Sequence, residues 1–133
     1  MNASGLSKNY NIGLLLIRVG VAVVFIYHGW GKLTGIEGVQ QFFGNIGIPL
    51  TGIMAWVVAV IEFVGGIMVL TGFKIRIPSI LLAIVMIVAL LTVKISAGFE
   101  QARVDILLLM MTIALAFMGP GGYSLDSMLG KKE

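Results

Sequence analysis

Five side chains that could bind a ligand or move protons stand inside or beside apolar segments: Arg18, Phe25, His28, Lys32 and Glu62. A charge in the middle of a membrane span costs about 2.5–3.5 kcal/mol and therefore needs a partner or a wet cavity. With a rise of 1.5 Å per residue, Arg18 lies about 9 Å from the start of its apolar run, and Glu62 lies about 12 Å from the end of the next run. Adjacent antiparallel helices would bring the two groups to a similar depth. The spacing therefore predicts an ion pair between Arg18 and Glu62.

The same five residues outline a crevice. Arg18, Phe25 and Lys32 fall within about 60° of one another on a helical wheel, and His28 lies about 80° away. Arginine, lysine and histidine can donate hydrogen bonds, Glu62 can pass protons, and an aromatic ring can pack against a flat ligand. We expect a polar crevice that holds a small ligand. The alternative is that Arg18 and Glu62 only position two helices.

Other polar residues near these segments have both a functional and a purely structural interpretation. His28 fits an ordinary interfacial histidine as well as a ligand-binding one. Lys32 and Lys94 could extend outward to lipid headgroups. Asp105 either closes the mouth of the crevice or begins the last helix, where a carboxylate meets the positive helix end.

The composition excludes several kinds of chemistry. The chain has no cysteine and a single histidine, which excludes an Fe–S cluster, a cysteine-bound zinc and bis-histidine haem within one chain. No metal, flavin or nucleotide motif and no nucleophile–base pair is present, so no catalytic residue is assigned. The net charge is only +3, and the basic residues form no stripe along the chain. Both observations argue against binding of nucleic acid. Any electron carrier would be a diffusible lipid or belong to a partner protein.

The elements that hold these residues are membrane spans. The chain has 133 residues, of which 59% are hydrophobic and 11% charged, with a mean hydropathy of +1.06. A soluble domain of this length cannot bury so much apolar surface. The first run is too long for a removable signal peptide. We expect one transmembrane domain over residues 1–133, an all-α integral membrane four-helix bundle. Its spans are expected at about 12–30, 50–70, 77–93 and 104–118.

Two short helices are expected outside the spans. Thr34 and Glu37 have the spacing of a capping box, followed by apolar residues at helical spacing. This pattern predicts a short amphipathic helix within 31–49, between helices 1 and 2, as a plain interfacial helix or as a lid over a pocket. Near the C-terminus, Ser124 could cap a helical turn that Gly130 ends. The apolar positions of the first short helix are Ile36, Val39, Phe42, Phe43 and Ile46.

The basic residues predict the orientation of the chain. Four spans place both termini on one side, and lysine and arginine are more frequent in cytoplasmic loops. Five basic residues fall on the side of the termini and three on the other side. We therefore expect a multi-pass protein of the plasma membrane with both termini in the cytoplasm. The five are Lys8, Lys74, Arg76, Lys131 and Lys132, and the three are Lys32, Lys94 and Arg103.

These motifs, in this order, resemble the DoxX family of small four-helix membrane proteins over about residues 13–129. Where that family usually has a glutamate before the fourth span, this chain has Asp105. The segments that carry the resemblance are Arg18, Phe25, His28–Lys32, Phe42-Phe43, Gly47-Ile48-Pro49, Glu62, Gly65-Gly66, Gly72, Arg76 and Gly119–Asp126.

The resemblance implies a redox role. The family is named for a link to an archaeal terminal quinol oxidase, and relatives include subunits of thiosulfate:quinone oxidoreductase. It implies an accessory subunit that binds or delivers a membrane quinone through the crevice around Arg18 and Glu62, beside a membrane redox partner. The alternative is a non-catalytic scaffold or assembly factor for a larger membrane complex. The bilayer is the expected surrounding, and a homodimer is compatible with the sequence.

Overall fold

The computed structural model describes residues 3–94 and 97–130, and within these ranges every regular element is helical. This confirms the all-α prediction. The elements are α1 (Ala3–Thr34), α2 (Ile36–Asn45), α3 (Thr51–Thr71), α4 (Arg76–Ala89), the π-helical segment η1 (Leu90–Lys94), α6 (Phe99–Met118) and α7 (Leu125–Met128).

Four of the described helices are long and apolar enough to cross a membrane, over Ser7–Thr34, Thr51–Thr71, Arg76–Val93 and Phe99–Met118. The second and third agree closely with the predicted spans. The first and the fourth are longer than predicted, because a polar residue such as Asn11 or Glu100 does not end a helix. In lipid a backbone must satisfy its own hydrogen bonds, which favours continuing the helix.

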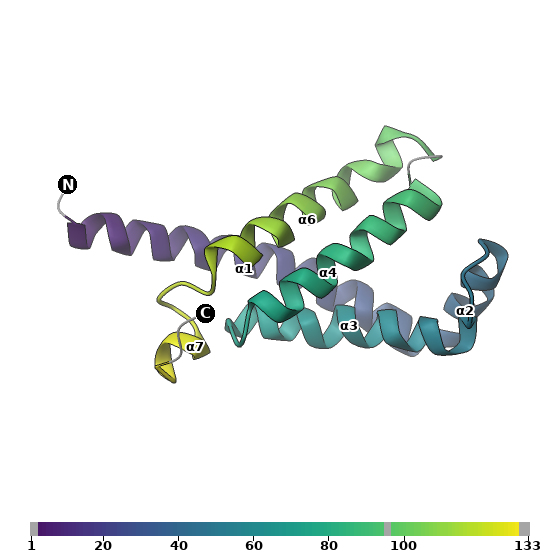
Figure 1. The fold of residues 1–133 in the computed structure, drawn as a ribbon, viewed down its shortest axis with the longest axis horizontal. Coiled ribbons are helices and arrows are strands. Elements are labelled where there is room, and N and C mark those ends of the chain that lie inside the picture. The colour runs from purple at the N-terminus through teal and green to yellow at the C-terminus, as the bar shows by residue number, and fades with distance from the viewer. Residues whose placement is uncertain (1–2, 95–96, 131–133) are drawn as a thin grey trace.

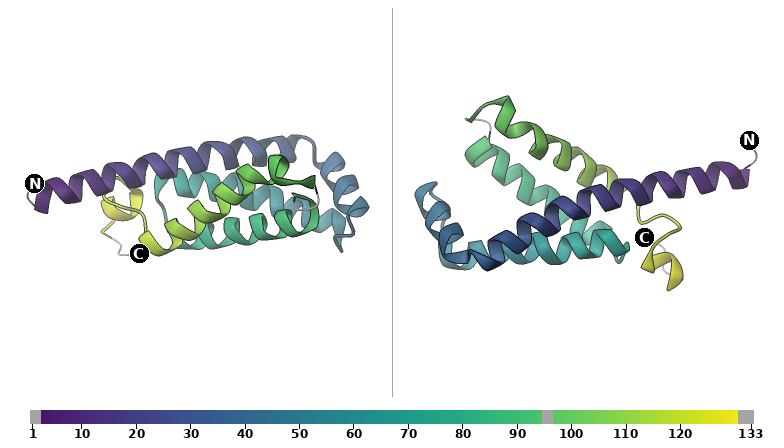
Figure 2. Two further views of the ribbon diagram at one scale, coloured as in Figure 1. Left: turned by 90° about the horizontal axis from the view of Figure 1, so that it is seen from above. Right: turned by 180° about the vertical axis from the view of Figure 1, so that it is seen from behind.

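The spans form two pairs that meet at one end and separate at the other. Figure 1 shows α1 beside α3 and α4 beside α6, with the pairs close together near α7 and splayed towards α2. The view from behind in Figure 2 shows the same divergence. We call these the α7 end and the α2 end. The start of α1 lies on the side of the α7 end, as an even number of spans requires.

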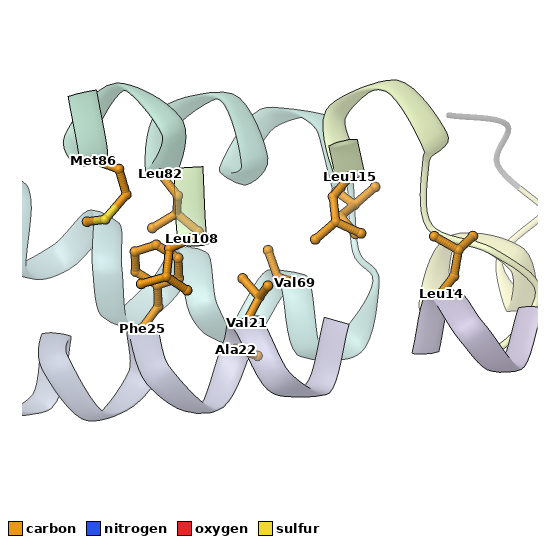
Figure 3. Packing of buried hydrophobic residues seen from close by; sticks show 10 residues of the cluster. Leu14, Val21, Ala22, Phe25, Val69, Leu82, Met86, Leu108 and Leu115 are labelled. Carbon is orange, nitrogen blue, oxygen red and sulfur yellow. The ribbon is translucent and has the colours of Figure 1, made fainter. Parts of the chain in front are cut away.

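The core lies where the two pairs cross. Phe25 of α1 is fully buried and lies with Leu82 and Met86 of α4 and Leu108 of α6 (Figure 3). Phe25 therefore packs in the core and is not among the residues that line the cavity between the helix pairs, where the sequence had placed it. The buried face of α3 consists of four small residues, one acid and a valine: Ala55, Ala59, Glu62, Gly65, Gly66 and Val69.

The predicted amphipathic helix is present as α2, but its predicted cap is wrong. The hydroxyl of Thr34 donates to the carbonyls of Trp30 and Gly31, at 3.0 and 3.2 Å, and so belongs to the last turn of α1. Gly35 begins α2 without a side-chain cap, and Phe43 is its buried residue. The capping box fails because α1 runs through to Thr34, whose hydroxyl bonds to carbonyls of α1, and because Gly35 takes the N-cap position of α2.

The predicted cap of α7 is confirmed. Ser124 Oγ accepts from the Ser127 amide at 3.1 Å and donates to the Gly121 carbonyl at 2.8 Å. Replacing Ser124 by alanine should cost about 1 kcal/mol of stability, as loss of a serine N-cap usually does. Faster hydrogen exchange at the Ser127 amide would report it. Ser127→Ala is the matched control in the same helix, because its side chain is exposed and should change stability by less than about 0.5 kcal/mol.

Candidate functional site

A cavity of about 520 Å³ lies at the α2 end, between the splayed helix pairs. Its walls are almost entirely apolar and come mainly from α2, α3, α4 and η1, while α1 and α6 contribute a few polar residues. Pockets of this size and character are typical of sites for small organic ligands. The apolar residues of the wall include Phe42, Phe43, Ile46, Val57, Leu81, Ile84 and Val88.

The polar part of the cavity centres on an ion pair between Lys32 and Glu62. Lys32 Nζ donates to Glu62 Oε2 at 2.8 Å. The Glu62 side chain is 3% exposed and that of Lys32 is 27% exposed, so the lysine keeps one side open to the cavity. The carboxylate is held by one charge-assisted hydrogen bond, while the lysine has further N–H donors to offer.

The predicted pair between Arg18 and Glu62 is not formed. The reason is the register of α1 against α3: Gly29 lies directly against the backbone of Phe63. Glu62 is therefore level with the last turns of α1, where Lys32 is. Arg18 lies eleven residues before Gly29, about 16 Å further along the helix axis.

His28 and Asp105 add two more polar groups to the cavity wall. Asp105 comes from α6 and is 8% exposed, which supports the interpretation that it closes the mouth of the site. The His28 ring lies 5.9 Å from the Tyr27 ring, centroid to centroid. Within residues 3–94 and 97–130, no group of three histidines or carboxylates is placed to hold a metal ion. The side chain of Lys94 lies outside the described part of the chain, so its predicted outward extension is untested.

A π-helical turn forms one edge of the cavity. Residues Leu90–Lys94 continue α4 with one extra residue per turn, and Thr92 and Val93 line the cavity from this segment. The Thr92 hydroxyl donates to the Val88 carbonyl at 2.7 Å. Single π-turns inside helices often occur at functional sites, because the inserted residue redirects the side chains around it. Sequence reasoning missed this segment, since its composition is that of any apolar helix.

Arg18 lies away from the cavity and binds four backbone carbonyls. Its Nε donates to Val69 at 2.9 Å and its Nη2 to Leu70 at 2.7 Å. Its Nη1 donates to Pro120 at 3.0 Å and to Tyr123 at 2.7 Å. The side chain is 1% exposed. Arg18 therefore joins α1 to the end of α3 and to the loop after α6, and it does not line the cavity in which the sequence had placed it.

The end of α3 explains why an arginine is needed there. Gly72 has a φ of 70°, and the amides of Gly72 and Phe73 donate to Val69 and Met68, as in a Schellman motif. Arg18 supplies donors to carbonyls that a helix end leaves without intrahelical partners. A side chain at Gly72 would collide with Ser124 and with the guanidinium. The glycine thus keeps space for Arg18.

Asp126 is a buried acid at the same place that sequence reasoning did not assign. Its side chain is fully buried, and its amide donates to the Gly72 carbonyl at 3.3 Å. Its carboxylate interacts electrostatically with Arg18, although neither oxygen has a hydrogen-bond partner among the described residues. The only hint of Asp126 in the sequence was its place in the Gly119–Asp126 segment. The pattern of that segment predicts a glycine-rich turn followed by a helix cap, and not a buried acid.

Comparison with known proteins gives consistent matches along the chain. The DoxX family model matches residues 13–95. A Bacillus subtilis protein named "Putative oxidoreductase CatD" is 43% identical over 131 residues, 96% of each chain. The inner membrane protein YqjF of Escherichia coli is 36% identical over 134 residues, 96% of this chain and 99% of its own. No solved structure matches the chain significantly.

Proposed function

The chain belongs to the DoxX family, and from this premise we propose that it is an accessory redox subunit that binds or delivers a membrane quinone in the cavity beside Lys32 and Glu62. The observation that carries the proposal is an apolar cavity at the depth of the spans, with a hydrogen-bond donor and an acceptor in its wall. The name of the Bacillus subtilis relative, "Putative oxidoreductase CatD", points in the same direction.

The residues of the cavity fit the chemistry of a quinone. A quinone accepts two electrons and two protons to become a hydroquinone. Lys32 can donate to a carbonyl oxygen with the N–H groups that Glu62 does not use. Glu62 and Asp105 can accept from a hydroquinone O–H. The sequence has no motif for an electron carrier of its own, so we propose that a partner protein supplies or takes the electrons.

The proposal predicts that Glu62→Gln loses the bound quinone. Protein purified from native membranes in mild detergent should carry near-stoichiometric quinone, measured by mass spectrometry of the extracted lipids. Loss of a charged hydrogen bond is worth about 1.5–3 kcal/mol, so the variant should retain about tenfold less.

Glu100→Gln is the matched control. Glu100 pairs with Arg103 at 2.7 Å, is exposed and does not line the cavity, so this variant should keep its quinone. Wild-type protein without quinone, or Glu62→Gln with a full complement, would contradict the proposal.

A second candidate function is a scaffold for a larger membrane complex. A groove of about 350 Å³ on α4 and α6 contains two small residues, Ala83 and Ala116, between larger apolar ones. Small residues on a span let a partner helix approach closely. A reproducible partner protein in the same preparation, with no quinone, would favour this function.

A further inference from the structure

We infer that the ligand enters the cavity sideways from the bilayer, between α3 and α4, and that it is a lipid whose hydrocarbon tail remains in that gap. The inference rests on the proposed function. It adds the route of entry and the shape of the ligand, which the proposed function leaves open.

The cavity is covered on the side of the membrane surface by α2. Phe42 and Phe43 of α2 and its C-cap residue Ile46 line the cavity, and Phe43 is buried. The Gln40 side chain donates to the Gly52 carbonyl at 3.1 Å and so ties α2 to the first turn of α3. The lid interpretation of this helix is thus the one that the contacts support. A water-soluble ligand would have to pass these apolar side chains.

The cavity is open between α3 and α4. Val57 of α3 and Leu81, Ile84 and Val88 of α4 line the cavity, yet each is between 39% and 51% exposed. All four belong to segments that are apolar enough to span a membrane. The two helix pairs separate on this side (Figure 1). Because these side chains lie at the depth of the hydrocarbon, the opening faces lipid tails.

The length of the opening suits a tail. Ile84 lies ten residues and Leu81 thirteen residues before Lys94, which is about 15–20 Å from the α2 end of this helix. The hydrocarbon core of a bilayer is about 30 Å thick, so the gap reaches close to its middle. A ring bound near Lys32 and Glu62 could therefore leave its tail in the gap, where burial of each methylene adds to binding.

The charges of the described cavity residues favour a neutral head. Lys32 is matched by Glu62, and Asp105 adds a second carboxylate. An anionic phospholipid would meet a net negative mouth, and like charges placed together weaken binding. A neutral ring with carbonyl or hydroxyl groups meets no such repulsion. This feature selects a quinone-like lipid over an anionic phospholipid.

Tryptophans in the gap test the route. In Val57→Trp combined with Ile84→Trp, the gap is filled while Lys32 and Glu62 are untouched. Binding of a long-tailed isoprenoid quinone and of its tail-less ring would be measured with the protein in nanodiscs. We expect the long-tailed quinone to bind about tenfold more weakly, while binding of the ring changes less than about twofold.

The matched control is Val60→Trp combined with Ile87→Trp. These residues sit on the same two helices and are similarly exposed, but they do not line the cavity. The control should bind both compounds as the wild type does. If the tryptophan pair in the gap does not fold, Val57→Ala with Ile84→Ala widens the gap instead. It should speed association of the long-tailed quinone and leave that of the ring unchanged.

The outcomes separate the route from the proposed function. Wild-type protein that binds neither compound overturns the proposed function and the route with it. Wild-type protein that binds both, with equal losses or no loss in the gap variant, overturns the route alone. Binding of an anionic phospholipid in preference to either quinone overturns the assignment of a neutral head.

Discussion

Replacing Arg18 by alanine should lower the free energy of unfolding by about 3–5 kcal/mol, the loss expected when one partner of a buried charged network is removed. Four carbonyls would lose a hydrogen bond from the guanidinium, two at the end of α3 and two in the loop after α6, and of these Val69 would keep the Gly72 amide as a donor. The buried carboxylate of Asp126 would lose the cation beside it. Denaturation in mixed detergent micelles, followed by circular dichroism, measures the change.

Two further variants test this explanation. Arg103→Ala removes an exposed arginine and should change stability by less than about 0.5 kcal/mol. Arg18→Ala combined with Asp126→Ala should cost less than the sum of the two single changes, because the isolated carboxylate is then gone. If Arg18→Ala left stability unchanged but abolished quinone binding, Arg18 would belong to the ligand site after all.

The next largest effect is expected from Gly29→Ala. A Cβ atom at Gly29 would lie 2.7 Å from the Cα and 2.8 Å from the Cβ of Phe63, closer than real contacts allow. Because Phe63 backbone atoms are involved, a side-chain rotation cannot relieve the overlap, and α1 would have to move away from α3. Overpacking of this kind costs about 1–3 kcal/mol.

Gly20→Ala is the control in the same helix. A Cβ atom there meets nothing within 4 Å. The change should be neutral or stabilising by up to about 1 kcal/mol, because alanine has the higher helix propensity. Equal effects at Gly20 and Gly29 in the same unfolding measurement would show that helix propensity, and not the contact with α3, decides both.

The two ends of the bundle therefore differ in structure: one is held by hydrogen bonds and the other encloses the cavity. At the α7 end, Arg18 and Asp126 join α1, α3 and the C-terminal loop into one hydrogen-bonded unit. At the α2 end the helix pairs separate around the cavity (Figure 2). A firm attachment at one end allows the other end to stay open without loss of the fold.

Much of this architecture was predictable from the sequence. The four spans, the amphipathic helix before α3 and the Ser124 cap are local features of hydropathy, periodicity and capping. In lipid, an apolar segment of this length is expected to be a helix, because every backbone N–H and C=O group must find its hydrogen-bond partner within the segment. The cavity residues His28, Lys32 and Glu62 were also among the predicted site residues. A polar or charged side chain in a span is costly, so it is expected to have a partner or to face a polar cavity.

The partner of each charge was decided only by the tertiary structure. Arg18 and Lys32 lie on one face of α1, so helical periodicity cannot tell which of them meets Glu62. The register does so, and it follows from close packing of Gly29 against Phe63 and of Gly66 against Ile26. These contacts place Lys32 beside Glu62 and leave Arg18 level with the end of α3. Such a register depends on the shapes of two helices together, which neither sequence segment contains alone.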